Sequence, residues 1–181
     1  MSQIHIMLDF ETLGQKPDTA VLSLGMTAFD KNTIHIKKEW LFSLGGQLAI
    51  GRTITPDTLL WWMNQGDKAK ALFQRVQKEG ILVRDWAPEF CKTVADISKK
   101  PKVWSNGAGF DVPILESLLY RCGMEPPYKF WDIRCYRTIK ALFGIEENLK
   151  REGTHHNALD DAIFQTQAIQ RWLTDHPHFD G

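Results

Sequence analysis

The chain has 181 residues, 43% of them hydrophobic and 24% charged, with 22 basic residues against 22 acidic ones. This length is enough for one domain with a real core, and the composition is that of a soluble α/β protein. Zero net charge argues against coating of long nucleic acid by phosphate neutralisation, but it is compatible with a grip on a few nucleotides at an end.

The sequence also lacks the marks of membrane and secreted proteins. No apolar run reaches ~18 residues, so we expect no membrane span. The opening "MSQIHIMLDF" lacks the basic region and cleavage site of a secretion signal, and we expect none. The three cysteines, Cys91, Cys122 and Cys135, are far apart, which predicts reduced thiols in a cytoplasmic protein rather than a disulfide or a zinc site.

Three strands are predicted at the start of the chain. The segment 3–10, "QIHIMLDF", is apolar on both faces, as a buried central strand would be. Its alternation places Ile4, Ile6, Leu8 and Phe10 on one face and His5, Met7, Asp9 and Glu11 on the other. Residues 20–30 and 33–44 read as the next two strands, joined by a turn.

Helices and short strands alternate in the remainder. A helix from Thr55 is followed by a break at Gly66, a further helical segment and an amphipathic helix over 83–100. Then come a strand at 102–106, a helix at 110–123, an extended piece at 129–135, a helix at 136–144 and a last helix from near Asn157 toward Trp172. A meander followed by βα units predicts an α/β fold with a mixed sheet flanked by helices.

Carboxylates follow two of the predicted strands. Asp9 and Glu11 project to one face at the carboxyl end of the first strand, where ligands gather in open α/β sheets. Two adjacent acids there repel each other and resist burial, and a cation would relieve both problems. Asp111 begins the helix after the strand 102–106, although an acid in a first helical turn also complements the helix dipole without any function.

The segment 153–162, "GTHHNALDDA", allows two registers: His155 with Asp160, or His156 with Asp161. Asn157 is a good N-cap, and helix capping alone accounts for Asp160. It does not account for Asp161, which is rotated by ~100° around the helix. His156, on the preceding loop, can fold back toward Asp161.

The segments "DFETLG", "NGAGFD" and "HNALDDA", in that order, resemble the three motifs of the DEDDh 3′-5′ exonucleases of the ribonuclease H-like superfamily. The neighbouring "LLWWMNQ" and "WDIRCYRTI" resemble the branch that contains a phage 3′ exonuclease and a mycobacterial exoribonuclease. The family motif, His followed five positions later by Asp, selects His156 and Asp161. The resemblance covers nearly the whole chain and implies a ribonuclease H-like, mixed five-stranded sheet, with three antiparallel strands plus parallel ones, in a single exonuclease domain over 1–181.

The resemblance implies a metal-dependent exonuclease that releases nucleoside 5′-monophosphates from 3′ ends of single-stranded DNA or RNA. Four carboxylates, Asp9, Glu11, Asp111 and Asp161, would hold two Mg²⁺ or Mn²⁺ ions, whose charge they balance. His156 would be the general base, since an unperturbed histidine pKa of ~6.5 suits proton transfer near neutral pH. Related exonucleases are commonly dimers, so a homodimer is compatible with the resemblance.

Substrate contacts are expected from residues near these motifs. Thr12 and Leu13 follow the first motif, and Leu13 could wedge against a base. Aromatic faces stack on any base, which makes Phe110, Trp61 and Trp62 candidates, although tryptophans at helical spacing are also typical of a core. Two alternatives stay open: a non-catalytic module of the same fold that binds 3′ ends, and another two-metal nuclease or nucleotide esterase.

Overall fold

A computed structural model describes residues 3–147, 149–153 and 156–179, and its centre is a five-stranded sheet. The strands are β1 (His5–Thr12), β2 (Val21–Phe29), β3 (Ile34–Leu41), β4 (Lys102–Ser105) and β5 (Ile133–Cys135), in the order β3-β2-β1-β4-β5. The first three pair antiparallel, whereas β4 and β5 run parallel to β1. The mixed sheet expected from the sequence is confirmed.

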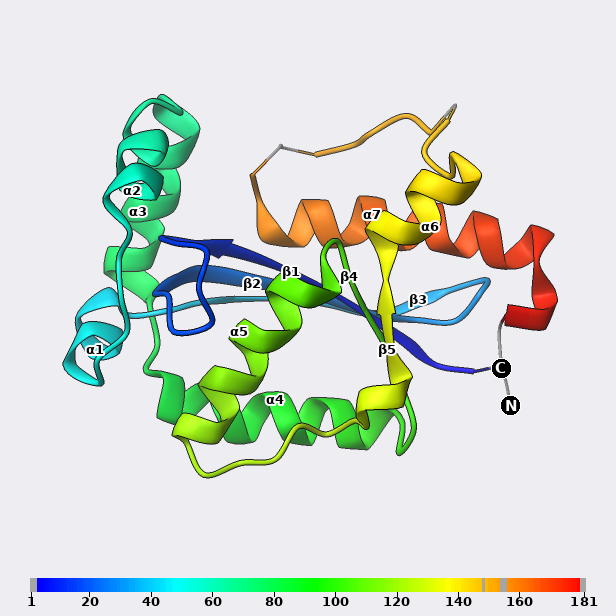
Figure 1. Ribbon diagram of the computed structural model, residues 1–181, viewed down its shortest axis with the longest axis horizontal. Coiled ribbons are helices and arrows are strands. Elements are labelled where there is room, and N and C mark those ends of the chain that lie inside the picture. The colour runs from blue at the N-terminus through cyan, green and yellow to red at the C-terminus, as the bar shows by residue number, and fades with distance from the viewer. Residues whose placement is uncertain (1–2, 148, 154–155, 180–181) are drawn as a thin grey trace.

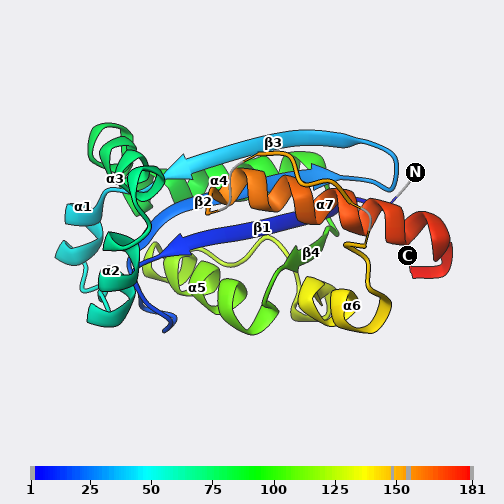
Figure 2. The same ribbon diagram turned by 90° about the horizontal axis from the view of Figure 1, so that it is seen from above.

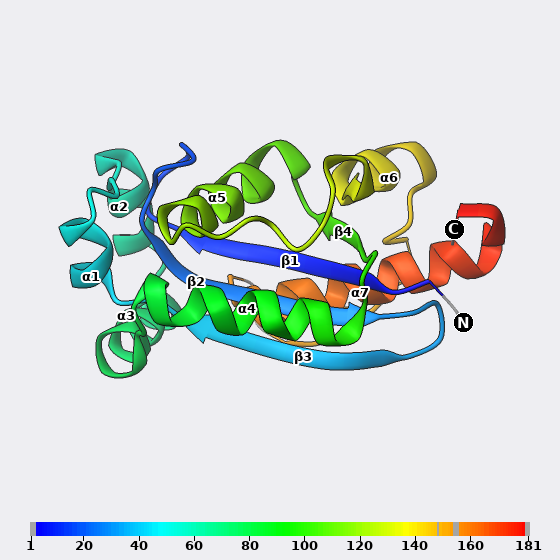
Figure 3. The same ribbon diagram turned by 90° about the horizontal axis from the view of Figure 1, so that it is seen from below.

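Helices cover both faces of the sheet (Figure 1). On one face lie α4 (Val83–Ile97) and α5 (Ala108–Arg121), and on the other lie α6 (Tyr136–Phe143) and the long α7 (Ala158–Asp175). Figure 2 shows α7 running along β1 and β2, and Figure 3 shows α4 crossing the opposite side. At one end of the sheet stand α1 (Leu44–Ala49), α2 (Pro56–Met63) and α3 (Asp67–Glu79). Short 3₁₀ turns cover Phe130–Asp132 and Pro177–Phe179.

The predicted alternation along β1 divides the core into two layers. Ile6, Leu8 and Phe10 pack with α4 and α5, whereas Met7 packs with α6 and α7. A third apolar cluster joins the sheet to α2 and α3 and includes Leu13, Trp62 and Leu72. Because β1 is buried on both faces, its polar end at Asp9 and Glu11 is fixed between the two helix layers.

The helix α7 approaches the sheet closely at a glycine. A Cβ atom on Gly25 of β2 would lie 2.1 Å from the backbone oxygen of Ala158, so only glycine fits there. Gly25 pairs directly with Asp9 in the neighbouring strand. Ala158 and Ala162 are also completely buried, and their small side chains bring the start of α7 against the strand that carries Asp9.

The structure corrects the sequence-based boundaries at two places. The third strand ends at Leu41, and the short helix α1 follows, because Ser43 caps it by accepting a hydrogen bond from Gly46 N at 3.2 Å. The expected extended piece at 129–135 is a strand only over its last three residues, after a 3₁₀ turn. Among the described residues, the helices are all too short or too polar to cross a bilayer.

Candidate active site

Asp9 and Glu11 lie on one face of β1 at its carboxyl end. Asp9 is half-buried, and Glu11 is only 8% exposed. The parallel strand β4 ends beside β1, since Leu8 pairs with Ser105. The turn after β4 therefore reaches the same edge of the sheet and carries the start of α5 toward the two carboxylates.

Asp111, in the first turn of α5, ties this turn to β1. Its Oδ1 accepts a hydrogen bond from Phe10 N at 3.4 Å, and its Oδ2 accepts one from Gly107 N at 3.2 Å. The side chain is 3% exposed. These bonds hold the Asp111 carboxylate beside those of Asp9 and Glu11. Interaction with the helix dipole alone therefore does not account for its position.

Asp161 is brought to the same place by α7. Asn157 caps this helix by accepting from Asp160 N at 2.9 Å, as the sequence predicts. Asp9, Glu11 and Asp161 each offer an oxygen, and these three oxygens all lie within 4.8 Å of one another. Carboxylate oxygens this close are suited to hold a divalent cation.

Two residues of the histidine motif line a pocket with the other carboxylates. His156 and Asp161 line one pocket of about 480 Å³ together with Asp9, Glu11 and Asp111. Asp160 does not line it and lies instead against Gly153, where a Cβ atom would stand 2.6 Å from Asp160 Cγ. His155 lies outside the described residues. The five residues of the family signature thus meet in a single pocket.

His156 has an unusual backbone conformation for a residue with a side chain, with φ of 63°. Such left-handed conformations are several-fold enriched for Asn, Asp and His and occur where the surroundings hold the residue. The imidazole ring meets the ring of Trp61 edge-on, with centroids 5.1 Å apart. This contact places the imidazole against a tryptophan that lines the adjoining pocket.

The carboxylates of the pocket are costly to ionise, because they are buried and repel one another. Burial raises the pKa of Asp9 well above its ordinary value, and repulsion from Asp111 and Glu11 adds to the shift. Burial and the Asp111 charge raise the pKa of Glu11 to about 7, and burial raises the pKa of Asp111 to about 6. These shifts indicate a site that would bind divalent cations, whose positive charge removes the cost of ionisation.

Several residues of the pocket were not found from the sequence. Gln165 donates from Nε2 to Asp9 Oδ1 at 2.8 Å, and Arg151 forms an ion pair with Asp161. Gln165 lies four positions after Asp161 on α7, so helical spacing could have indicated it. Arg151 stands in an irregular segment and had no such signal. Tyr136 and Lys140 from α6 also line the pocket, together with Arg137, which the sequence does offer as a possible phosphate contact.

A second pocket of about 460 Å³ adjoins the first and shares Phe10, Glu11 and Phe110 with it. Thr12, Trp61 and Trp62 line this second pocket. Trp61 is 42% exposed, whereas Trp62 is 2% exposed and donates from Nε1 to Thr12 O at 2.8 Å. The two neighbouring tryptophans therefore differ: one offers a free face, and the other supports the backbone of the motif.

Leu13 does not reach either pocket. It is 1% exposed and packs in the cluster with Ala20 and Leu22. Its backbone continues the hydrogen bonding of the motif, because Leu13 N donates to Ala20 O at 2.8 Å and Leu13 O accepts from Thr55 N. The expected wedge against a base is therefore not available to this side chain, which serves as core.

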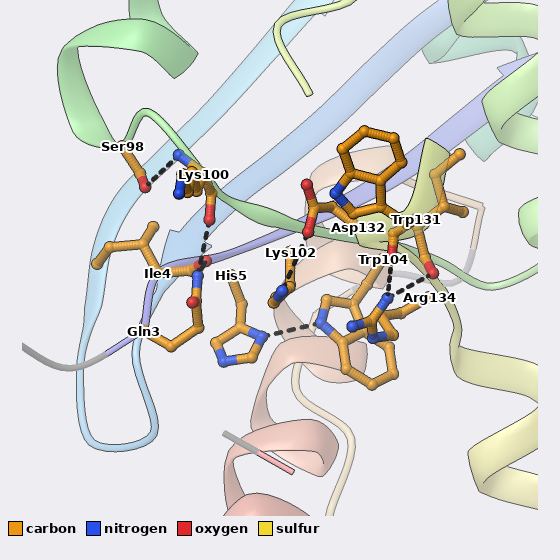
Figure 4. Close-up of polar contacts among 11 residues, drawn as sticks. Gln3, Ile4, His5, Ser98, Lys100, Lys102, Trp104, Trp131, Asp132 and Arg134 are labelled. Atoms are coloured by element: carbon orange, nitrogen blue, oxygen red, sulfur yellow. Dashed lines mark hydrogen bonds and ion pairs between the residues drawn. The ribbon is translucent and has the colours of Figure 1, made fainter. Parts of the chain in front are cut away.

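Polar residues at the other end of β4 and β5 are structural (Figure 4). The buried Trp104 donates to His5 Nδ1 at 3.0 Å, and Asp132 forms an ion pair with Lys102 at 3.0 Å. Arg134 donates to the backbone oxygens of Trp131 and Ile133. These residues lie outside both pockets.

Comparison with known proteins agrees with the geometry. The model of the 3′-5′ exoribonuclease Rv2179c-like domain matches residues 4–173. The chain belongs to this family. The Rv2179c-like family is one of 3′-5′ exonucleases, as the three motifs of the sequence indicate.

Relatives of the Rv2179c-like chain include an exodeoxyribonuclease of Enterobacteria phage T4, which is 28% identical and is matched over 78% of this chain and 73% of its own length. The fold matches the nuclease domain of 3′hExo, a DEDDh family member bound to rAMP, with a TM-score of 0.60, 15% identity and coverage of 96% of this chain and 93% of that one. It also matches E. coli exonuclease I in complex with a dT13 oligonucleotide, with a TM-score of 0.64, 15% identity and 98% of this chain covered. The chain spans only 42% of that exonuclease I. The ribonuclease H-like fold is thereby confirmed.

Proposed function

We propose that this chain is a metal-dependent 3′-5′ exonuclease that releases nucleoside 5′-monophosphates from the 3′ ends of single strands, with residues 1–181 acting as one domain. The observation that carries the proposal is the convergence of Asp9, Glu11 and Asp161, from two elements far apart in sequence, within 4.8 Å of one another. Asp111 and His156 line the same pocket. Membership of an exonuclease family supports the same activity.

The four carboxylates would hold two Mg²⁺ or Mn²⁺ ions. The donor set fits these ions, because it consists of carboxylate oxygens that are partly buried and mutually repulsive. When bound, two such ions activate water and stabilise the attacking and leaving oxygens of an in-line displacement. Asp9 and Glu11 come from a rigid central strand, so the ligands are held in place before any ion arrives.

The residues of the chain supply the proton transfer and the orientation. His156, which lines the acidic pocket and meets Trp61 edge-on, accepts the proton of the attacking water. The water oxygen bonds to phosphorus, and the bond from phosphorus to the 3′ oxygen of the preceding nucleotide breaks. Gln165 orients Asp9 by its hydrogen bond to Oδ1.

The two adjoining pockets define where a strand would lie. The terminal nucleoside would occupy the second pocket, where Trp61 and Phe110 offer aromatic faces for stacking. The scissile phosphate would then lie in the acidic pocket, and the preceding strand would pass Arg137 at its rim. We infer that a terminal base enters the second pocket unpaired, which favours single strands as the substrate.

Both DNA and RNA stay within the proposal. The family is described as exoribonuclease, whereas the phage relative is an exodeoxyribonuclease. We propose a cytoplasmic location, which is supported by three cysteines that are all free thiols. A homodimer stays a prediction, to be measured by sedimentation.

The deciding experiment follows nucleotide release from matched single-stranded DNA, RNA and poly(A) oligomers with Mn²⁺, with and without chelator. We expect 5′-monophosphates to be released from linear strands and none from circular strands. Asp9→Asn and Asp161→Asn should abolish release while the protein stays folded by circular dichroism. Binding of 3′ ends without release would instead support a non-catalytic module, and cleavage of circles would indicate an endonuclease.

A further inference from the structure

Arg151 places a positive charge among the acidic ligands of the proposed active site. The residue lies between α6 and α7, and 22% of its side chain is exposed. Its Nη2 forms an ion pair with Oδ1 of Asp161, and its charge lowers the pKa of Asp9. The guanidinium stands over the ring of Phe164, 4.9 Å from the centroid, so its plane is fixed from one side.

The guanidinium of Arg151 has a hydrogen-bond donor that is not used. Nε is shielded from solvent and has no hydrogen-bond acceptor within the described part of the chain. A buried donor without a partner is costly, and the planar fork of an arginine is shaped for two oxygens of a carboxylate or a phosphate. Asp161 Oδ1 pairs with Nη2 and leaves Nε, on the same edge of the guanidinium, without an acceptor. An oxygen-rich ligand that entered the pocket would supply this acceptor.

The net charge of the pocket determines when it would attract a phosphate. Four ionised carboxylates, Arg151 and Arg137 sum to a formal charge of −4 + 2 = −2, because Lys140 in the same pocket is paired with Glu146. Two divalent cations would change this sum to −2 + 4 = +2. The single negative charge of a phosphodiester then brings it to +1. The pocket therefore repels a phosphate before the metal ions bind and attracts one afterwards, and Arg151 supplies part of that positive charge.

We propose that Arg151 is a shared cation, which pairs with Asp161 in the metal-free pocket and binds an oxygen of the scissile phosphate in the metal-loaded pocket. The inference rests on the proposed function, because it assigns Asp161 to the metal ligands. It makes Arg151 a competitor of the metal for Asp161 and at the same time a ligand of the substrate. The released 5′-monophosphate carries the same phosphate and would contact the same residue.

A purely structural arginine would behave differently. Its loss would lower the melting temperature without tightening metal binding. A competitor, in contrast, weakens metal binding in the wild-type protein, so its removal strengthens that binding. The guanidinium of Arg151 stands over the ring of Phe164, and the sulfur of a methionine also makes favourable contacts with aromatic rings while the substitution removes the charge. Lysine keeps the charge and removes the fork.

The test is calorimetric titration of the metal-free full chain with Mn²⁺, followed by titration of the loaded protein with AMP and dTMP. We expect Arg151→Met to bind Mn²⁺ about tenfold more tightly and the monophosphates about tenfold more weakly. Arg151→Lys should bind Mn²⁺ like the wild type but bind the monophosphates more weakly. Arg75→Met, which removes an arginine that pairs with Glu39 outside both pockets, should leave Mn²⁺ affinity within about twofold.

The outcomes separate this inference from the proposed function. Unchanged or weaker Mn²⁺ binding by a folded Arg151→Met overturns the shared cation, and so does an equal gain in Arg75→Met. If Arg151→Met does not fold, Arg151→Lys decides, because undiminished monophosphate binding then overturns the phosphate contact. If the wild-type protein takes up no Mn²⁺, the metal-dependent function fails first, and the inference fails with it.

Discussion

Gln165 Nε2 donates a hydrogen bond of 2.8 Å to Oδ1 of Asp9, although 156 positions separate the two residues in the sequence. The bond orients a proposed metal ligand and favours its ionised form. Partners of this kind typically contribute 10–100-fold to metal affinity or activity. We therefore expect Gln165→Leu to weaken Mn²⁺ binding and nucleotide release by roughly 10-fold or more, measured by calorimetry and by product formation.

The same helix offers a matched control. Gln170 also lies on α7 and donates from its side-chain amide, but to Asp30 O at 2.8 Å, and it lines neither pocket. Gln170→Leu should leave Mn²⁺ affinity and release unchanged. Equal losses in both variants would mean that Gln165 acts through the stability of α7 and not through Asp9.

The histidine motif gives a prediction about register. His156→Ala removes the proposed base and should slow release by about 10²- to 10⁴-fold while Mn²⁺ binding persists. His155→Ala is the natural comparison, since the sequence alone allows either histidine. The measurement is the single-turnover rate at saturating Mn²⁺. A damaging His155→Ala beside a harmless His156→Ala would contradict the assignment.

The adjacent tryptophans should separate binding from stability. Trp61 is 42% exposed and lines the second pocket, so Trp61→Ala should weaken binding of a single strand by roughly 1–3 kcal/mol, the usual worth of a stacked base. Trp62 is 2% exposed and holds Thr12 O, so Trp62→Ala should cost about 3–5 kcal/mol of folding free energy. Binding titrations and urea unfolding measure the two effects. The assignment fails if Trp61→Ala destabilises the protein as much as Trp62→Ala.

Much of the sheet was predictable because its signals are local. The alternation in β1 places Ile6 and Met7 on opposite faces, and the structure packs them in different clusters. The places of Asp9 and Glu11 at a strand end and of Asp111 at a helix start were also predictable from local patterns, whereas the family motif was needed to select His156 and Asp161. Ser43 and the following glycines gave no periodic pattern, so the six-residue α1 was not predicted.

Contacts between distant segments could not be predicted from local patterns. Arg151 meets Asp161 from an irregular stretch, and nothing in its neighbours indicates that partner. Leu13 shows the opposite failure, since its place after the motif suggested a substrate contact. The side chain packs instead in the apolar cluster with residues of α2 and α3, because burial of a leucine stabilises the folded protein by ~1.5–3 kcal/mol.

Two arginines of one segment provide a test of the strand path. Arg137 lines the acidic pocket, whereas the guanidinium of Arg134 is used by two backbone oxygens outside it. Arg137→Gln should weaken single-strand binding and reduce the salt dependence by about one phosphate contact, a slope change of roughly 0.7. Arg134→Gln should change neither. Fluorescence anisotropy over a salt series, with both variants in an Asp9→Asn background to prevent cutting, gives both numbers.

The raised carboxylate pKa values predict how stability depends on pH. Burial with the Asp111 charge raises the pKa of Glu11 from 4.5 to about 7, and burial raises the pKa of Asp111 from 3.8 to about 6. A group whose folded-state pKa is raised favours folding while it is protonated, and this contribution is lost as pH rises through the folded value. The metal-free protein should therefore lose stability between about pH 4 and pH 7 through these groups.

Divalent cations should reverse this loss, because they bind the ionised carboxylates and displace their protons. We expect Mg²⁺ to raise the melting temperature more at pH 7.5 than at pH 5, where protons compete. Glu11→Gln should stabilise the metal-free protein at pH 7.5 by up to roughly 3 kcal/mol, the free energy of its pKa shift, and should reduce the effect of Mg²⁺. Glu152→Gln, which changes an exposed carboxylate, should do neither. Scanning calorimetry at both pH values decides: if Mg²⁺ stabilises the protein equally at pH 5 and pH 7.5, the buried carboxylates are not its ligands.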